Sequence, residues 1–309
     1  MRHGRDSEWK ARMPAVIGLT ALSLAVAGMV ALPAAALAAK ANKASPTYYV
    51  SLGDSYSVGY QPALGATTGY TGYVTAKSHL TLVNFGCGGA TTTSIIDDVG
   101  CPDVLPHTAG GVTYPTTTQA VAAEAFLTAH RGHIGLMTVS IGGNDVTACA
   151  TAANPITCVG TAVTSIKTNV TSLVAALRAA AGPKVPLIGL TYPDVILGSY
   201  VYPSLPATAA RTSLAQESVV AFKGLINPAL KTAYASAGGV LVDVTAATGA
   251  YTALTKTQTL APYGTIPVAV ANVCTLTWFC KLGNIHATDK GYALIGKLVT
   301  AQYVRMRGH

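Results

Sequence analysis

Residues 48–57 of this 309-residue chain read YYVSLGDSYS and contain a strand signal that ends abruptly. The run from Tyr48 to Leu52 is mostly aromatic and apolar, which favours a β-strand, and Gly53 interrupts it. Asp54 and Ser55 follow directly, so polar side chains stand at the carboxyl end of the strand. We therefore predict a strand over 48–52 followed by a turn that belongs to a binding or reactive site.

The rest of the chain alternates between strand and helix signals. Apolar stretches predict four more strands at 81–85, 134–141, 187–191 and 240–244. Helical spacing of apolar residues predicts helices at 69–80, 118–130, 161–181, 208–237 (with a break near Asn227-Pro228) and 289–306. This alternation predicts an α/β fold with a five-stranded parallel sheet and helices on both faces. Residues 194–207 and 245–285 are expected to be long irregular loops that border the site.

The first residues have the order of an export signal. A basic start, with Arg2, Arg5, Lys10 and Arg12, precedes a small and apolar run over 15–37 that ends in Ala36-Leu37-Ala38. We predict a cleaved signal peptide over 1–38, a polar linker over 39–46, a folded domain over 47–309, and secretion. A retained membrane anchor is the alternative, since the apolar run approaches the length of a spanning helix.

Charge excludes one class of partner. The formal net charge is +8, and removal of residues 1–38 leaves 16 basic and 10 acidic residues, or +6. These charges are scattered and form no basic run with interleaved aromatics, so we expect no nucleic-acid partner. The positive net charge is compatible with transient attraction to anionic lipid or cell-wall polymers. We expect the protein to be a monomer.

Six cysteines in an exported chain predict disulfide bonds. Six cysteines allow 15 pairings. We predict the sequence-local set Cys87–Cys101, Cys149–Cys158 and Cys274–Cys280. The chain has no C-x-x-C pair, and its histidines lie away from the cysteines, so we expect no metal and no cofactor.

Four polar segments are expected to meet at the carboxyl edge of the sheet. They are Gly53-Asp54-Ser55, the glycine block 84–91, Gly142-Gly143-Asn144-Asp145, and Gly283-Asn284-Ile285-His286. A serine becomes a nucleophile when a histidine accepts its proton. Acyl transfer then needs donors for an oxyanion, and Ser55 N–H, Gly89 N–H and the Asn144 amide are candidates.

These segments resemble the four blocks of the GDSL/SGNH hydrolase family, in order and spacing, and resemble most its secreted actinobacterial members. The resemblance implies a flavodoxin-like three-layer α/β/α sandwich and ester hydrolysis through an acyl-enzyme. It implies Ser55 as nucleophile, His286 as base, and Ser55, Gly89 and Asn144 as oxyanion hole. Asp54 and Asp145 are expected to support the site. The substrate would be a small-molecule or lipid ester.

One position departs from the family pattern. The family usually has an aspartate three residues before the histidine, and Gly283 stands there in this chain. We expect the Gly283 backbone carbonyl to accept a hydrogen bond from His286, with Asp289, Asp243 or another carboxylate as alternatives. Loss of the carboxylate forgoes its stabilisation of the imidazolium.

Several alternatives remain at the level of the sequence. With the same site, the enzyme would be an acetylesterase acting on polysaccharide, a phospholipase or a thioesterase. A non-catalytic envelope-binding protein on a hydrolase scaffold is supported only by the missing aspartate. Trp278 and Phe279 would either contact the acyl group or pack in the core.

Overall fold

The computed structural model of the protein describes residues 47–102, 109–205 and 207–308. The predicted signal peptide and linker lie outside these residues. Five parallel strands form one sheet in the order β2-β1-β3-β4-β5. The strands are β1 (Tyr48–Gly53), β2 (Thr81–Asn84), β3 (Ile134–Ser140), β4 (Leu187–Leu190) and β5 (Val240–Val242).

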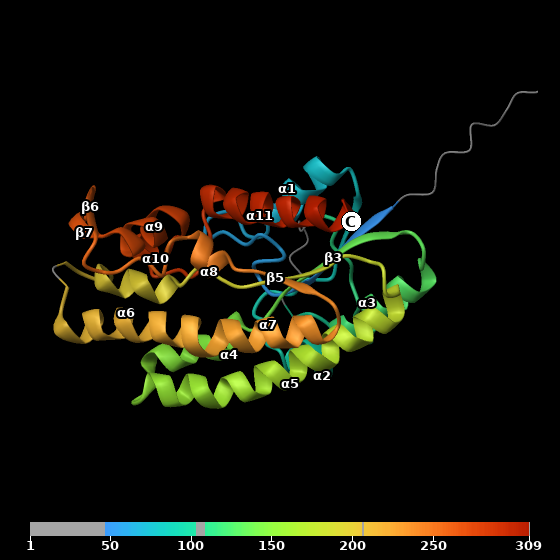
Figure 1. Ribbon diagram of the computed structural model, residues 1–309, viewed down its shortest axis with the longest axis horizontal. Coiled ribbons are helices and arrows are strands. Elements are labelled where there is room, and N and C mark those ends of the chain that lie inside the picture. Colours follow the sequence, from blue (N-terminus) through green and yellow to red (C-terminus); the bar gives the residue numbers. More distant parts are fainter. Residues whose placement is uncertain (1–46, 103–108, 206, 309) are drawn as a thin grey trace, which may run out of the picture. The chain divides into compact units, whose positions relative to one another are not determined.

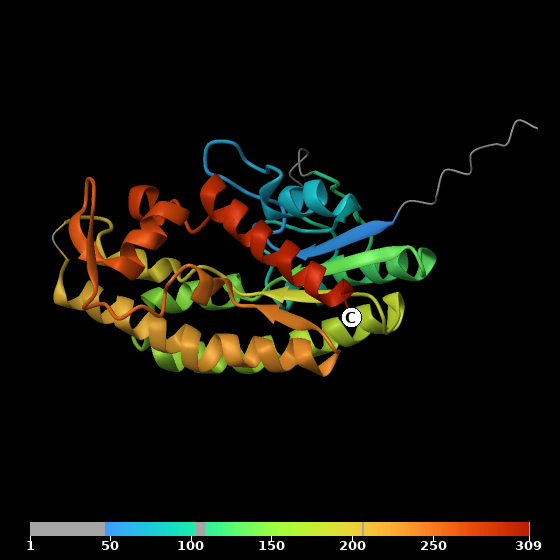
Figure 2. The same ribbon diagram turned by 45° about the horizontal axis from the view of Figure 1, so that its top comes forward.

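Helices cover both faces of this sheet (Figures 1 and 2). On one face, α1 (Gly69–Ser78) packs along α11 (Asp289–Arg307). On the other face, α5 (Pro155–Ala181) packs between α3 (Gln119–Ala129) and α7 (Asn227–Ser236). The predicted three-layer α/β/α sandwich with a five-stranded parallel sheet is therefore confirmed.

The central strands are buried because both faces of the sheet are covered. Every residue of β1 after Tyr48 is buried, and so is nearly all of β3. At the carboxyl end of β1, Gly53 has a φ of +136°, and a Cβ there would lie 2.0 Å from the Ser140 carbonyl oxygen. Only glycine allows β1 to pass so close to β3, so Gly53 fixes where the chain leaves the sheet.

One helix begins well before its expected start, and another contains a local irregularity. Helix α5 begins at Pro155 instead of residue 161, because Asn154 caps it by accepting the Thr157 N–H at 3.0 Å. The expected break near Asn227-Pro228 takes the form of a π-helical turn, η3 (Phe222–Ile226), which separates α6 (Ala209–Ala221) from α7 and ends directly before Asn227. Pro228 lies in the first turn of α7, where proline is tolerated.

The prediction of an irregular loop over 245–285 was wrong, since most of this segment forms helices and strands. It contains α8 (Val244–Ala247), an antiparallel hairpin of β6 (Thr257–Leu260) and β7 (Gly264–Pro267), α9 (Val268–Leu276) and α10 (Phe279–Leu282). The segment 194–207 includes a 3₁₀ helix, η2 (Val195–Tyr200). Among the described residues, none of the helices combines the length and the apolar character that crossing a membrane requires.

Candidate active site

Ser55 lies in the turn that follows β1. The Asp54 N–H donates to the Ser140 carbonyl at 3.1 Å, and the Ser57 hydroxyl donates to the Asp54 carbonyl at 2.6 Å. The Ser55 carbonyl accepts the Tyr60 N–H at 3.0 Å, which closes the turn around the serine. Only 7% of the Ser55 surface is exposed. The turn therefore presents a largely desolvated hydroxyl at the carboxyl edge of the sheet.

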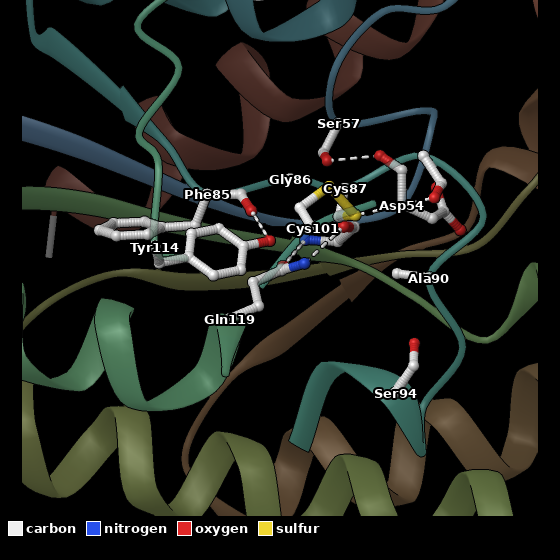
Figure 3. The surroundings of a disulfide bond; sticks show 12 residues. Asp54, Ser57, Phe85, Gly86, Cys87, Ala90, Ser94, Cys101, Tyr114 and Gln119 are labelled. Carbon is white, nitrogen blue, oxygen red and sulfur yellow. Dashed lines mark hydrogen bonds between the residues drawn. A yellow bond between two sulfur atoms is a disulfide. The ribbon is translucent and has the colours of Figure 1, made fainter. Parts of the chain in front are cut away.

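Gln119, which the sequence did not single out, anchors this turn. Its side chain accepts the Gly53 N–H at 2.7 Å and donates to the Gly53 carbonyl at 3.1 Å (Figure 3). The same carbonyl accepts the Cys87 N–H at 2.9 Å, and Cys87 is bonded to Cys101. These contacts join the end of β1 to the glycine block. No sequence signal marks Gln119, because its role depends on burial at the start of α3.

His286 reaches Ser55 across the carboxyl edge. Its Nε2 lies 2.8 Å from the Ser55 hydroxyl oxygen. Its Nδ1 lies 2.8 Å from the side-chain oxygen of Asn284, so the expectation that the Gly283 carbonyl orients the ring was wrong. Gly283, at a φ of +66°, ends α10, and the Asn284 side chain turns back to accept the His286 N–H at 3.1 Å. This local asparagine turn places the amide oxygen beside the imidazole.

The two carboxylates considered as alternatives have other partners. Asp289 accepts the Gln61 side-chain amide at 2.7 Å, and Asp243 caps α8 by accepting the Ala246 N–H at 2.8 Å. Burial alone lowers the pKa of His286 to about 4, because desolvation disfavours the imidazolium. His286 is therefore neutral at pH 7 and able to accept a proton from Ser55.

The three candidate oxyanion donors lie on neighbouring segments. Within the described part of the chain, the N–H groups of Ser55 and Gly89 have no hydrogen-bond partner. Gly89 has a φ of +76°, and a Cβ there would meet open space, so its glycine serves the backbone conformation. The Asn144 side chain donates to the Ala90 carbonyl at 2.8 Å, which fixes its amide next to the glycine block and leaves one N–H for a ligand.

Of the predicted supporting residues, Asp145 connects the Asn144 turn to the residue that follows the glycine block, and Asp54 joins the Ser55 turn to Tyr192, which follows β4. Asp54 is buried and accepts the Tyr56 N–H at 2.9 Å and the Tyr192 hydroxyl at 2.5 Å. Burial raises the pKa of Asp54 to about 7. Asp145 accepts the Thr92 N–H at 3.0 Å and the Thr92 hydroxyl at 2.5 Å. The turn that carries Asn144 is thereby held against the glycine block.

An apolar pocket adjoins Ser55 and Asn144 and lies between two helical walls. One wall comes from α4 (Gly143–Thr147), η1 (Ala148–Thr151) and the start of α5, and the other from η2, α6 and η3. The apolar lining of the first wall is Val146, Cys149, Ala150, Pro155, Ile156 and Val159. That of the second wall is Val195, Ile196, Leu214, Ala221, Phe222 and Ile226.

The walls of this pocket were not predicted. From the two segments expected to border the site, only Val195, Ile196 and Ile285 line the pocket. Trp278 and Phe279 do not line it. The indole N–H of Trp278 donates to the Gln61 side chain at 3.3 Å, and the Phe279 ring packs edge-on against Tyr202. Of the two interpretations of these aromatics, packing is therefore the one that the structure favours.

The structure contains the three sequence-local disulfides, Cys87–Cys101, Cys149–Cys158 and Cys274–Cys280. The first ties down the glycine block. The second joins η1 to the first turn of α5 and so closes one wall of the apolar pocket. The third joins α9 to α10, close to the loop that carries His286.

The model of a family described as the GDSL-like lipase/acylhydrolase family matches residues 51–294. No curated protein matches the sequence.

Among solved structures, an extracellular lipase from Streptomyces rimosus is similar at 21% identity and a TM-score of 0.48, over 83% of this chain and 98% of that one. A phospholipase A1 from Streptomyces albidoflavus NA297 is similar at 20% identity and a TM-score of 0.42, over 66% of this chain and 82% of that one.

Proposed function

Because this chain belongs to the GDSL-like lipase/acylhydrolase family and is an ester hydrolase of the SGNH type, we propose that it cleaves esters of apolar acyl groups through an acyl-Ser55 intermediate. The observation that carries the proposal is the 2.8 Å contact between His286 and Ser55, which itself lines an apolar pocket. An activated hydroxyl supplies the chemistry, and the pocket supplies the preference for the acyl group.

The reaction follows from the positions of these groups. The Ser55 oxygen attacks the acyl carbon while its proton passes to His286 Nε2, and the carbonyl oxygen becomes an oxyanion. The N–H groups of Ser55 and Gly89 and the Asn144 amide stabilise that charge. The C–O bond to the alcohol then breaks, and the alcohol leaves with the proton from His286. Water attacks the acyl-Ser55 ester in the same way and releases the free acid.

The lining of the pocket supports an apolar acyl group over an acetyl group. An acetyl group leaves an apolar pocket of this extent unfilled, whereas each buried methylene contributes about 0.8 kcal/mol. A phospholipid or a thioester offers the same acyl part, so the pocket supports both as substrates alongside a simple lipid ester. The binding-protein alternative loses its support, since Asn284 supplies the acceptor that Gly283 lacks.

We further propose that the enzyme is secreted and acts as a monomer without metal or cofactor. Six cysteines joined in three disulfides suit an oxidising compartment, and an extracellular lipase is among the similar structures. Cleavage of the export signal after residue 38 is tested by intact mass measurement of protein recovered from the culture medium. Protein found only in the membrane fraction, with residues 1–38 attached, would contradict secretion.

The substrate proposal is tested with p-nitrophenyl esters of increasing acyl length. We expect kcat/KM to rise about fourfold for each added methylene until the pocket is filled, as 0.8 kcal/mol per methylene implies. Activity that is highest on the acetyl ester and falls with length would contradict an apolar acyl preference. In that case acetylated polysaccharide would be the next substrate to assay.

A further inference from the structure

The imidazole of His286 has no acidic partner. Among the described residues, its ring nitrogens contact only the Ser55 hydroxyl and the Asn284 amide oxygen. Asp54 directly precedes Ser55, but its carboxylate accepts a hydrogen bond from Tyr192. The Asp289 carboxylate accepts one from Gln61. The titratable groups on the segments around the ring are Asp54, Tyr56, Tyr60, Tyr192, Tyr202, Lys281, Asp289 and Tyr292. The base is therefore oriented by neutral groups.

Asn284 determines which ring nitrogen carries the proton. An amide oxygen only accepts hydrogen bonds, so its 2.8 Å contact requires a hydrogen on Nδ1. The neutral ring then has its lone pair on Nε2, the nitrogen that faces the Ser55 hydroxyl at 2.8 Å. The opposite tautomer would direct an N–H at Ser55 and could not accept its proton. The same oxygen also accepts the His286 N–H, which holds side chain and backbone together.

Resting on the proposed function, we infer that Asn284 is the positioning residue of the base and completes a Ser55–His286–Asn284 triad. The contact geometry assigns it this part directly, since its oxygen bonds the ring nitrogen opposite the one that faces Ser55. An amide oxygen can accept Nδ1–H from both the neutral and the protonated ring. It carries no full charge, however, so it stabilises the imidazolium less than a carboxylate would.

The loop around His286 is held from two further directions. The Tyr56 hydroxyl donates to the Ile285 carbonyl at 2.7 Å, and the backbone N–H of Trp278 donates to the His286 carbonyl at 2.9 Å. The Tyr60 ring lies 4.5 Å from the imidazole, measured between ring centroids. These contacts fix the backbone and one face of the ring, whereas Asn284 is the contact that sets the tautomer. Removal of the Asn284 amide should therefore change the chemistry more than the fold.

The experiment compares Asn284→Ala and Asn284→Asp with the wild type over pH 3 to 9. We expect Asn284→Ala to lower kcat at least tenfold with KM within twofold, because the ring loses its orientation and not its substrate. Asn284→Asp should retain high activity and move the acidic limb of kcat/KM up by about 1 to 3 pH units, as a carboxylate next to an imidazole does. For the wild type, the limb is expected at about pH 4, where the burial-lowered pKa of His286 lies.

Gln258→Glu is the matched control, since it makes the same amide-to-acid change on the exposed strand β6. It should move neither kcat nor the acidic limb. An acidic limb that stays in place in Asn284→Asp, together with full kcat in Asn284→Ala, would overturn the inference and return the role to a backbone carbonyl.

A second readout separates failure of this inference from failure of the proposed function. NMR titration of the imidazole, assigned through His286→Ala, measures the pKa of His286 without any substrate. If Asn284→Asp raises that pKa, Asn284 contacts the base even in an enzyme whose substrate has been misjudged. If the pKa stays unchanged while the wild type hydrolyses esters through Ser55, the triad is wrong and the proposed function stands.

Discussion

The Ser55 hydroxyl oxygen lies 2.8 Å from Nε2 of His286, although 231 residues separate the two in the chain. The serine comes from the turn after the second strand in sheet order, and the histidine precedes α11, the last helix, which packs along α1. The parallel sheet makes this meeting possible, because every strand directs its following loop to the same edge. The reactive pair is therefore a consequence of topology as much as of local sequence.

The oxyanion hole is tested at Asn144. Asn144→Ala should lower kcat by about 10²- to 10³-fold with little change in KM, because the lost N–H acts on charge that develops only in the transition state. Asn272→Ala is a suitable control, since the Asn272 amide also donates to a single backbone carbonyl, that of Thr248, at 3.1 Å. Steady-state kinetics should show the loss in the first variant alone. Equal losses in both would mean that a general structural defect was being measured.

The apolar pocket is tested by two neighbouring positions on α6. Ala221 is buried and lines the pocket, whereas Val220 is 59% exposed on the outer face of the same helix. Ala221→Phe should depress kcat/KM for long acyl esters about tenfold or more and spare the acetyl ester, because a side chain too large for the site fills the space of the acyl chain. Val220→Phe should leave the chain-length profile unchanged. A profile that shifts in neither variant would place the acyl group elsewhere.

Stability should depend on pH through Asp194, which is buried beside the pocket and accepts the Ser218 hydroxyl at 2.9 Å. Burial raises the pKa of Asp194 from 3.8 to about 7 in the folded protein. Between those pH values the carboxyl of Asp194 is protonated in the folded state and ionised in the unfolded state. Its contribution to the free energy of unfolding is therefore full below pH 3.8 and is lost as the pH rises through 7.

Asp194→Asn should therefore flatten the fall in stability between pH 5 and pH 8, by an amount on the order of 2 kcal/mol. Urea unfolding at the two pH values measures the difference. The exposed Asp98→Asn should keep the wild-type pH dependence. A slope that is the same in wild type and Asp194→Asn would show that Asp194 is ionised in the folded state.

The sequence was most informative where local pattern and tertiary environment agree. The strands at 48–53 and 134–140 are buried on both faces, and their runs of apolar residues predict this burial. It was least informative where the role of a side chain depends on a hydrogen bond to a residue far away in the sequence, or on the exact conformation of a turn. Gln119 bonds Gly53, which is 66 residues away in the chain. The His286 ring is bonded by the Asn284 amide oxygen, and not by the expected Gly283 carbonyl, because the Asn284 side chain folds back onto the residue two positions later. The pocket walls were missed because α6 and the start of α5 carry no motif and acquire their role by packing.

The central claim is that Ser55 is a nucleophile activated by His286, and a fluorophosphonate probe tests it most directly. The purified wild type should be labelled at Ser55, and labelling should disappear in Ser55→Ala and His286→Ala, while the exposed controls Ser236→Ala and His133→Ala are labelled normally. The modified peptide, identified by mass spectrometry, should contain Ser55. A folded wild type that takes up no label, or a Ser55→Ala variant that is labelled as strongly as the wild type, would contradict the account.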